Sequence, residues 1–391
     1  MKILIITNRF VIGGPTNHIA DLAYGLQDEF EIKIIGGVAT KFEVINLDIF
    51  SKLKNEPTVI DGFSRKISLF NDLRSYIEIK KIIKEFKPDI VHTHTSKPGF
   101  MGRIAARRLH VKTIIHTFHG NIFDGYFNTF ISNIIIKIEK YLAKRSTSII
   151  TLSEKQKTNI IERLNIKNSQ KVNIIKIGID TEKFSETIKS RVKFREKYSL
   201  KDNDIALGIV GRISEIKNIK LFIRGVKHLK DKGFDNVKGF IVGDGIEKQD
   251  LKIYCETIGV DYLEYGIGNN LASIIFTSWC YDVSKVYPGL DILALTSLNE
   301  GTPYSIIEAQ LAGVAIIASN VGGVSNIVEE GKTALLFSED AEFYSKLELL
   351  VMDKNLRDNL GSQAKIYAKN EFDLKLMIEK TKKLYLDLIN R

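Results

Sequence analysis

Five of the seven histidines lie in one stretch, VHTHTSKPGFMGRIAARRLHVKTIIHTFHG. Imidazole is the commonest protein metal ligand at neutral pH, so the spacings H-x-H and H-x-x-H suggest a zinc site. His92 and His94 share a face if they end a strand, and His116 and His119 would end the next strand. No cysteine lies among them, and an acidic ligand would have to come from elsewhere. His110, on a basic helix, is expected at the surface.

A second candidate site is DILALTSLNEGTPYSIIEAQLAG, residues 291–313, where two glutamates flank the start of a predicted helix. Glu300 follows a strand, and Glu308 lies within the helix that opens near Tyr304. The first backbone N–H groups of a helix, here those of Tyr304 and Ser305, have no partner inside it and attract anions. These groups could bind a phosphate, and Glu308 a ribose diol. The alternative is that both glutamates are solvated surface residues.

Two cations follow another predicted strand in IVGRISEIKNIKLFIRGVKHL. The strand ends at Val210, Gly211 frees the backbone, and Arg212 and Lys217 lie at the entry to the next helix. A guanidinium and an ammonium group beside the end of a strand suit a pyrophosphate. Basic loop residues are common, so the argument depends on their position beside the anion site above.

Gly13 and Gly14 follow the first strand in TNRFVIGGPTNHIADLAYGL. The pattern is not G-x-G-x-x-G, so the dinucleotide-binding motif is absent. A glycine pair before a helix still lets the backbone approach a ligand closely, although an ordinary turn would look the same.

Predicted strands and helices alternate through the chain, and their arrangement decides whether the candidate site residues lie close together. Apolar runs such as KILIIT and DIALGIVG predict buried parallel strands, with amphipathic helices between them. The pattern runs twice, which predicts an α/β protein with two doubly wound sheets and ligands at the carboxyl ends of the strands. We expect domains at residues 1–185 and 186–371, with a last helix at about 372–391 that packs back on the first domain.

The bulk composition narrows the class of protein. No apolar run approaches the 18 or so residues of a membrane span, and the short apolar start does not resemble a signal peptide. Cys255 and Cys280 follow no metal or redox spacing. A cytoplasmic protein is therefore expected, or one peripheral at the inner face of the membrane.

Positive charge is concentrated in the first half, where residues 1–190 carry 30 Lys and Arg against 19 Asp and Glu, while the remainder carries 27 against 28. The first domain is thus expected to meet an anionic acceptor or an anionic membrane surface. The alternative is that the aromatic residues of this half, such as Phe123 and Tyr126, pack in the core and that its lysines only make the protein soluble. No recognition motif accompanies the charge, so nucleic acid is not expected. The candidates are a cationic helix face and nearby aromatics: Arg103, Arg107, Arg108, Lys112, Phe123 and Tyr126.

Together these motifs resemble those of the family 4 glycosyltransferases, retaining enzymes of the GT-B fold (glycosyl transferases group 1). The resemblance is carried by Gly13–Gly14, THTSKPGFMGRIAA, HTFHG, GR with Lys217, VGDG, and the pair Glu300–Glu308 followed by AGVAIIASNVGGVSNIVEEGKTALL. It implies two Rossmann-like domains that face each other across a cleft, with acceptor binding in the first and nucleotide-sugar binding in the second.

The resemblance also implies roles for single residues. Arg212 and Lys217 would hold the donor diphosphate, Glu300 the hydroxyls of the transferred sugar, and Glu308 the ribose. Catalytic candidates are therefore His119, which would lie beside the donor sugar, together with Arg212, Lys217 and Glu300. The expected donor-binding residues are Gly13, Gly14, Gly211, Gly243, Thr302, Pro303, Tyr304, Ser305 and Glu308.

In the resembled family the cations neutralise the leaving diphosphate, so no metal or other cofactor is expected here. A metal-dependent transferase would show D-x-D after a strand, whereas Asp202–Asn203–Asp204 precedes one and predicts a turn. The expected function is retaining transfer of a hexose or N-acetylhexosamine, most simply from a UDP-sugar, to a saccharide or lipid-linked acceptor in cell-surface polysaccharide synthesis.

The segment IGNNLASIIFTSWCYDVSKVYPGL departs from the family, which usually has a short helix and small residues there. Because it borders the expected base and sugar pocket, base and sugar identity stay open. Two rival functions also remain. One is a nucleotide-sugar 2-epimerase on the same fold, with the histidines as acid–base groups, and the other is a non-catalytic protein that binds anionic lipid or polysaccharide.

Overall fold

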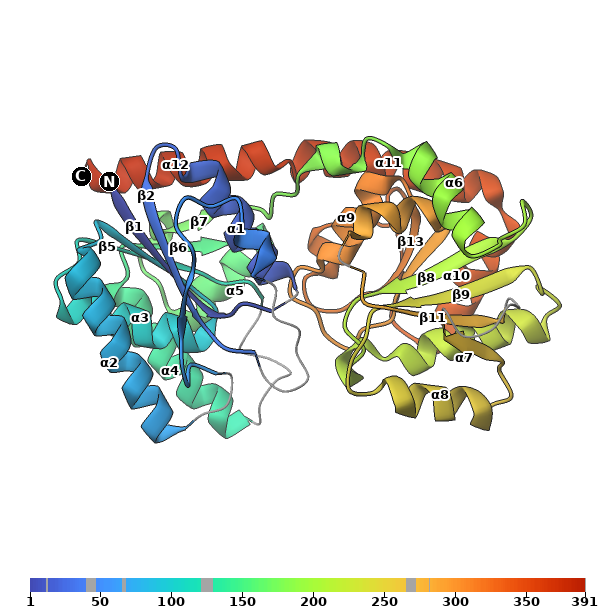
Figure 1. Ribbon diagram of the computed structural model, residues 1–391, viewed down its shortest axis with the longest axis horizontal. Helices are drawn as coiled ribbons and strands as arrows, with labels where there is room; N and C mark the ends of the chain where they lie inside the picture. Colours follow the sequence, from blue (N-terminus) through green and yellow to red (C-terminus); the bar gives the residue numbers. More distant parts are fainter. Residues whose placement is uncertain are drawn as a thin grey trace. The chain divides into compact units, whose positions relative to one another are not determined.

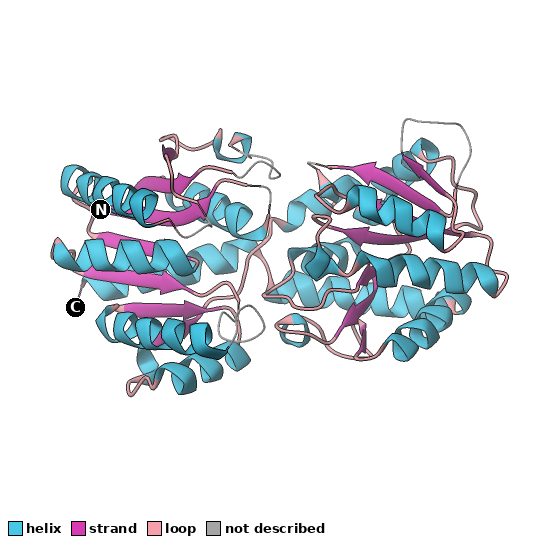
Figure 2. Ribbon diagram, turned by 90° about the horizontal axis from the view of Figure 1, so that it is seen from below, coloured by secondary structure: helices cyan, strands magenta, loops and turns pink. Residues whose placement is uncertain are grey.

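A computed structural model describes residues 1–11, 13–39, 47–64, 68–120, 129–264, 272–280 and 282–390. The chain forms two units, Met1–Ile179 with Phe372–Arg391 and Asp180–Glu371. In each, helices cover both faces of a parallel sheet (Figures 1 and 2). The chain leaves the first unit a few residues before the boundary at 185 that the sequence suggested.

The first unit is built on a sheet of order β3-β2-β1-β4-β5-β6-β7. Its strands are rich in isoleucine and valine and are buried on both faces, the pattern that a covered parallel sheet requires. The strands are β1 (Lys2–Arg9), β2 (Glu31–Gly37), β3 (Thr58–Ile60), β4 (Ile90–His94), β5 (Thr113–Thr117), β6 (Ser148–Thr151) and β7 (Val172–Ile174).

Helices on the two faces of this sheet bury different cores. On one face Ile19 of α1 and Met377 and Tyr385 of α12 pack with strand residues such as Ile3, and α1 and α12 lie side by side (Figure 1). On the other face α2 and α3 pack against β1 and β4. The helices are α1 (Gly14–Leu26), α2 (Leu69–Phe86), α3 (Ser96–Arg108), α4 (Thr129–Arg145), α5 (Glu154–Leu164) and α12 (Leu374–Ile389).

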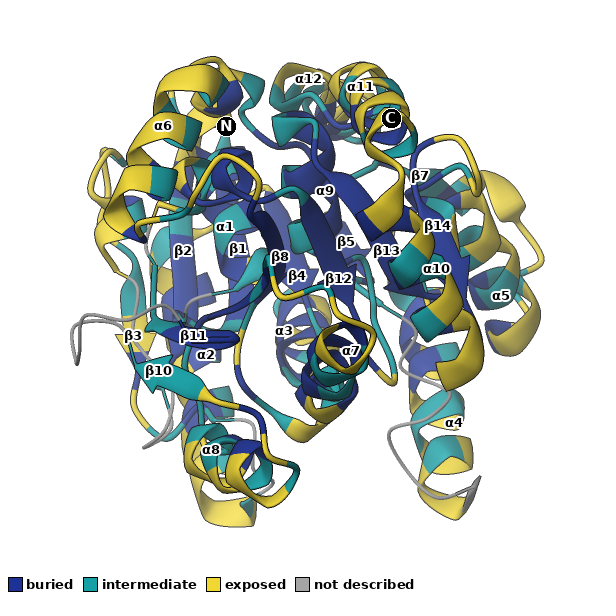
Figure 3. Ribbon diagram, turned by 90° about the vertical axis from the view of Figure 1, so that its right-hand side faces the viewer, coloured by how far each residue is buried: buried dark blue, intermediate teal, exposed yellow. Residues whose placement is uncertain are grey.

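The second unit repeats this plan with the order β10-β11-β9-β8-β12-β13-β14. Its strands are β8 (Ile205–Val210), β9 (Val237–Val242), β10 (Tyr262–Glu264), β11 (Ile274–Ser278), β12 (Ile292–Leu295), β13 (Ala315–Ser319) and β14 (Leu335–Phe337). Its helices are α6 (Thr187–Lys197), α7 (Ile219–Asp231), α8 (Lys248–Thr257), α9 (Tyr304–Ala312), α10 (Asp340–Met352) and α11 (Lys354–Glu371). In Figure 3 the strands of this unit are mostly buried, except for β10, which is intermediate, and the outward helix faces are exposed.

The prediction of two doubly wound parallel sheets is confirmed. Three strands were missed. The strands β3 and β10 have only three residues each, and β11 lies in the segment that departs from the family pattern. Among the described residues, no helix has both the length and the apolar character needed to cross a membrane.

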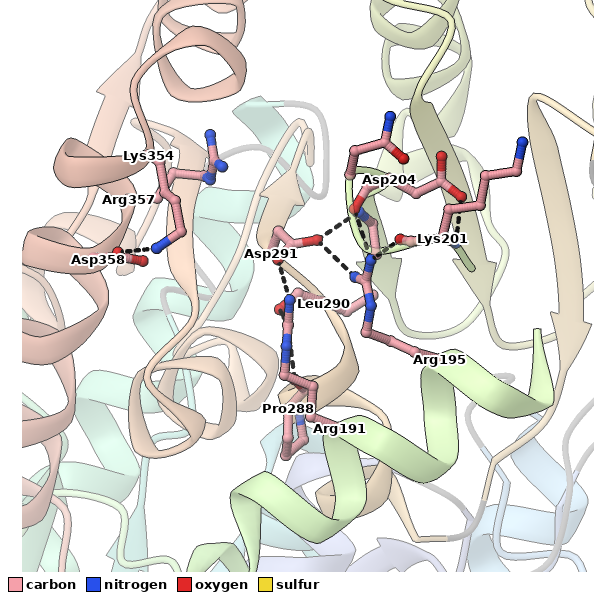
Figure 4. Close-up of polar contacts among 12 residues, drawn as sticks. Arg191, Arg195, Lys201, Asp204, Pro288, Leu290, Asp291, Lys354, Arg357 and Asp358 are labelled. Atoms are coloured by element: carbon pink, nitrogen blue, oxygen red, sulfur yellow. Dashed lines mark hydrogen bonds and ion pairs between the residues drawn. The ribbon is translucent and has the colours of Figure 1, made fainter. Parts of the chain in front are cut away.

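A charged cluster fastens α6 to the amino ends of β8 and β12 (Figure 4). Arg191 Nη2 donates to Asp291 Oδ1 at 2.7 Å, Arg195 Nη1 donates to Asp291 Oδ2 at 3.3 Å, and the Ala206 N–H donates to the same Oδ2 at 2.8 Å. Asp204 Oδ2 accepts the Lys201 N–H at 2.8 Å just before β8. The predicted turn at 202–204 is therefore confirmed, and this end of the sheet is occupied by structural contacts.

Candidate functional site

The strand order of the second unit places a topological switch point between β8 and β12. From β8 the chain proceeds outward through β9 to one edge and then returns to β12 on the other side of β8. Loops that leave the carboxyl ends of two such strands diverge and leave room for a ligand. The loop after β8 contains Arg212 and Lys217, and the loop after β12 contains Glu300, so the topology brings the predicted site residues to one place.

Lys217 and Glu300 are in direct contact at this point. Lys217 Nζ donates to Glu300 Oε1 at 2.7 Å, and Ser297 Oγ donates to the same oxygen at 2.6 Å. The backbones are tied as well, since the Leu298 N–H donates to the Ile216 carbonyl at 2.8 Å. Both side chains are mostly buried, at 20% and 13% exposure. The Glu300 side chain is therefore fixed by hydrogen bonds and mostly buried, and the alternative of a solvated loop glutamate is wrong.

Glycines allow the loops around this pair to pack closely. A Cβ on Gly322 would lie 1.9 Å from the Glu300 carbonyl oxygen, and one on Gly243 would lie 1.9 Å from the Gly211 carbonyl oxygen. The Gly323 N–H also donates to the Glu300 carbonyl at 3.1 Å. Gly243 was expected to shape a base pocket, and its observed contact is with the loop after β8. Because these glycines have no side chain, the backbone of the loops that contain Lys217 and Glu300 can pack this closely against its neighbours.

The amino end of α9 follows directly on the loop that contains Glu300. Tyr304 and Ser305 are its first two residues, and Pro303, at the cap position, makes no side-chain capping hydrogen bond. The amino end of a helix carries a partial positive charge, and no acidic residue occupies the first turn of α9. Thr302 precedes the cap in the loop that contains Glu300. Together with Lys217 this end of α9 can bind an anion such as a phosphate.

Glu308 lies one turn further along α9 and is partly buried. Burial raises the pKa of its carboxyl group to about 7, while the hydrogen bond from Tyr287 and the charge of Lys183 act in the opposite direction. Tyr287 Oη donates to Glu308 Oε2 at 2.9 Å, and the tyrosine ring is fully buried. A partly buried carboxylate held by one donor is suited to accept hydrogen bonds from a diol. The alternative of an exposed helix glutamate is wrong.

Tyr287 was missed by the sequence analysis. It lies in the 3-10 helix Tyr287–Gly289 just before β12, within the segment that departs from the family pattern. Its contact with Glu308 joins positions separated by 21 residues, and only the fold brings them together. In the sequence, the neighbouring Pro288 was the one indication of a rigid turn at this position.

The first unit has its own switch point, between β1 and β4. Gly13 caps α1 after β1 with a φ of 154°, and Gly14 begins the helix. Nothing lies within 4 Å of a Cβ built on Gly13, so its backbone faces open space. His94 ends β4, and His119 follows β5. Gly14 and His119 are therefore at the ligand edge of this sheet, as expected.

The four histidines at the ends of β4 and β5 differ in their hydrogen bonds. His92 is fully bonded, with Nδ1 at 2.6 Å from Tyr385 Oη and Nε2 at 2.7 Å from Thr117 Oγ1. His116 Nδ1 lies 2.8 Å from Thr93 Oγ1. His94 Nδ1 lies 2.9 Å from His119 Nε2, and burial lowers the pKa of both imidazoles well below the usual value. His110 is exposed, in a turn after α3.

Arg103 requires a correction. Its side chain is 2% exposed, and Nη2 donates to both carboxylate oxygens of Glu139 on α4 at 2.7 and 2.8 Å. It therefore fastens α3 to α4 and does not belong to a cationic surface. The sequence analysis grouped it with Arg107 and Arg108 by spacing, but those two point outward and are exposed, as is Lys112 beyond the helix. Phe123 and Tyr126 lie outside the described residues.

An exposed apolar surface lies instead on α2 and α4, which flank α3 (Figure 1). Leu69 and Phe70 are 88% and 78% exposed at the start of α2, and Phe130 is 74% exposed at the start of α4. Exposed cations accompany them, including Lys81 and Lys137. We call this the α2/α4 surface. Its members are Leu69, Phe70, Leu73, Ile77, Phe130, Ile131, Ile134, Ile138 and Tyr141.

Comparison with protein families gives two matches that together span most of the chain. Residues 12–183 match the model described as Glycosyltransferase Family 4, and residues 190–367 match the one described as Glycosyl transferases group 1. Among curated proteins, the chain is 31% identical over 329 residues to the UDP-Gal:alpha-D-GlcNAc-diphosphoundecaprenol alpha-1,3-galactosyltransferase of Escherichia coli, covering 83% of this chain and 82% of that protein. It is 28% identical over 341 residues to the capsular polysaccharide biosynthesis glycosyltransferase CapM of Staphylococcus aureus, covering 85% of each.

Solved structures share the fold at lower identity. The structure of Anabaena Alr3699/HepE in complex with UDP superposes with a TM-score of 0.78 at 18% identity, covering 99% of this chain and 100% of that one. WaaG, a glycosyltransferase involved in lipopolysaccharide biosynthesis, superposes with a TM-score of 0.72 at 16% identity over 98% and 99% of the two chains.

Proposed function

The chain belongs to the family 4 glycosyltransferases, of the glycosyl transferases group 1 and the GT-B fold, and we propose that it moves a hexose or N-acetylhexosamine from a UDP-sugar to a lipid-linked or saccharide acceptor. The transfer retains the anomeric configuration and needs no metal. One observation carries this proposal, the 2.7 Å contact between Lys217 and Glu300 beside the amino end of α9. It joins a cation, a carboxylate and a helix terminus at the switch point of a parallel sheet.

The donor diphosphate is held by Lys217, Arg212 and the first turn of α9. Lys217 supplies one positive charge at the site, and Arg212, exposed in the same loop, supplies a second. The helix terminus adds N–H donors. In the free protein Glu300 neutralises Lys217, and a bound diphosphate takes over part of that role. Glu300 is then available to accept hydrogen bonds from the transferred sugar.

The nucleoside is held by Glu308, whose carboxylate accepts hydrogen bonds from the ribose hydroxyls. Tyr287 fixes the orientation of that carboxylate and favours its ionised form. The family resemblance implies further donor contacts from Gly14, at the β-phosphate, and from His119, at the transferred sugar.

In the reaction the bond between the anomeric carbon and the diphosphate oxygen breaks, and the acceptor hydroxyl oxygen forms its bond on the same face. The acceptor proton passes to the departing phosphate oxygen, so UDP leaves carrying it. Negative charge develops on that oxygen where Lys217, Arg212 and the α9 terminus are placed, and each such donor is typically worth ~10²–10³ in rate. Glu300 orients the sugar, and the family resemblance implies the same role for His119.

The choice of UDP and of a lipid-linked acceptor has support from related proteins. The galactosyltransferase relative is named for UDP-Gal and for a diphosphoundecaprenol acceptor, and a Campylobacter jejuni relative, 25% identical, is named for a PP-undecaprenol acceptor. HepE was crystallised with UDP and with UDP-glucose. A lipid-linked acceptor suits a protein that rests on a membrane surface.

The α2/α4 surface supports peripheral contact with an anionic membrane. Apolar side chains that stand out from the two helices flanking α3 can enter the interface, and lysines beside them attract anionic headgroups. Arg107, Arg108 and Lys112 add positive charge near these helices.

Product analysis tests the proposed function. The protein is incubated with UDP-glucose, UDP-galactose and the UDP-N-acetylhexosamines, each with an undecaprenyl-diphosphate sugar and each alone. We expect one donor to be consumed only with acceptor, with an α-linked product. A β-linked product contradicts retention. Conversion of a UDP-sugar to its 2-epimer without acceptor identifies the rival epimerase, and membrane binding with no turnover identifies a binding protein.

A further inference from the structure

Three histidines from separate elements of the first unit meet at the ligand edge of its sheet. His18 comes from α1, His94 from the end of β4, and His119 from the loop after β5. One nitrogen from each lies within 4.8 Å of the other two. The ring centroid of His18 lies 5.7 Å from that of His94 and 5.1 Å from that of His119. The centroids of His94 and His119 are 5.1 Å apart. His18 was not considered in the sequence analysis, because more than seventy residues separate it from the others.

Hydrogen bonding leaves part of this cluster unsatisfied. The contact between His94 and His119 uses one nitrogen of each ring. His94 Nε2 and His18 Nδ1 are buried without a hydrogen-bond partner among the described residues, and their side chains are 0% and 4% exposed. Native proteins rarely leave buried polar atoms unpaired, and an absent ion is one cause of such an orphan. His92, next to the cluster, has both nitrogens bonded.

The imidazoles are in the state that metals require. Burial lowers the pKa of His18 to about 4 and holds the pKa values of His94 and His119 well below the usual range. All three are neutral at pH 7, and a neutral imidazole carries one lone pair for a ligand bond. In the 2.9 Å contact the two rings share one proton. An ion there would replace that proton, which would move to an outer nitrogen of His94 or His119.

We propose that His18, His94 and His119 form a binding site for a first-row divalent ion, with zinc as the best match. Three imidazoles suit zinc, cobalt and copper and do not suit magnesium or calcium, which prefer oxygen ligands. Zinc–nitrogen bonds of about 2.0–2.1 Å place tetrahedral ligand atoms roughly 3.3 Å apart. One nitrogen from each ring lies within 4.8 Å of the other two, and rotations of the rings can bring them to that value.

The site has an entry and an open position. His119 is only partly buried, so the cluster can be reached from solvent. Three protein ligands leave the fourth tetrahedral position for water or a substrate oxygen. The ion site uses none of the groups that supply positive charge to the proposed diphosphate site, which are Lys217, Arg212 and the first turn of α9. Loss of zinc binding and loss of metal-free nucleotide binding are thus separate outcomes.

The test uses the full chain, freed of metal with EDTA and then dialysed. Zinc is titrated by calorimetry and cobalt by its visible absorption, on the wild type and on His18→Gln and His119→Gln. His110→Gln is the matched control, because His110 is exposed and outside the cluster. Thermal unfolding shows whether each variant folds.

We expect the wild type and His110→Gln to bind one zinc ion and to give the intense absorption of tetrahedral cobalt. The two cluster variants should bind at least about tenfold more weakly, which corresponds to about 1.4 kcal/mol. No stoichiometric zinc binding by the wild type, or equal affinity in His18→Gln, overturns the proposal. If the cluster variants do not fold, X-ray absorption at the zinc edge of the loaded wild type decides it, since fewer than three imidazole ligands would overturn the site.

Discussion

Lys217 and Glu300 stand 83 residues apart in the sequence and 2.7 Å apart in the structure, where β8 and β12 end. The contact is a consequence of strand order. Adjacent parallel strands whose connections leave in opposite directions bring the residues that follow them together. A cation and a carboxylate on those two loops then share one site with the amino end of α9.

Replacement of Lys217 by alanine should lower kcat/KM for the donor by ~10²–10³, because the cation no longer meets the charge that develops on the leaving diphosphate. Glu300 also loses its partner, so part of the loss should appear as weaker donor binding. Steady-state kinetics measure both, and Lys217→Arg should recover part of the rate. Lys220→Ala, an exposed lysine on α7, is the control. Equal kinetics for Lys217→Ala and Lys220→Ala would remove Lys217 from the mechanism.

Donor affinity should rise with pH through about 7, since the carboxyl group of Glu308 has its pKa there in the free protein and only the carboxylate can accept both ribose hydrogen bonds. A UDP-sugar is the right probe, because its diphosphate does not titrate near pH 7. Binding measured from pH 5.5 to 8.5 should show the change in the wild type and lose it in Glu308→Gln. Tyr287→Phe removes the hydrogen bond that lowers this pKa and should shift the profile to higher pH. A flat wild-type profile would contradict the assignment.

The carboxyl group of Glu308 also makes the protein less stable as the pH rises, whereas it makes donor binding stronger. Its pKa is higher in the folded protein than the usual 4.5, so the native state holds the proton more tightly than the unfolded chain. The stabilisation is complete below about pH 4.5 and is lost as the pH rises toward 7, by on the order of 3 kcal/mol. Urea unfolding of wild type and Glu308→Gln across this range should show a smaller decline for the variant.

Arg103→Ala should destabilise the first unit by about 3–5 kcal/mol, because it leaves the buried Glu139 carboxylate without its partner. Arg107→Ala and Arg108→Ala, on the same helix but exposed, should change stability by no more than about 0.5 kcal/mol. Denaturant unfolding compares the three. Joint replacement of Arg103 by Met and Glu139 by Leu should restore much of the loss. Similar small effects for all three arginines would show that Arg103 belongs to the surface.

Binding to vesicles should depend on anionic lipid and on the α2/α4 surface. Sedimentation with phosphatidylglycerol vesicles should recover the wild type, whereas neutral phosphatidylcholine vesicles should recover little, and added salt should weaken binding. Phe70→Ser with Phe130→Ser should reduce binding several-fold. Ile253→Ser with Ile366→Ser, two exposed apolar residues of the second unit, is the control. An equal loss in both pairs, or binding indifferent to lipid charge, would contradict the proposed contact.

The fold was largely predictable, because apolar strand runs and amphipathic helices alternate twice. The loops after β8 and β12 were predictable too, since each follows a clear strand and carries charged residues beside glycines. Contacts between distant segments were not. Nothing local joins Tyr287 to Glu308 or His18 to His119, and Arg103 has the spacing of a surface arginine although Glu139 holds it in the interior. The strand β11 was missed because the segment around it was compared with a family pattern that it does not follow.

The most direct test of the account is calorimetric titration of UDP, GDP and ADP into the full chain in EDTA, for the wild type and for Arg212→Ala with Lys217→Ala. We predict that UDP binds at one site without metal, that GDP and ADP bind much more weakly, and that UDP binding is lost in the double variant. If no nucleotide binds until zinc or magnesium is added, the metal-free diphosphate site built on Lys217 and Arg212 is contradicted.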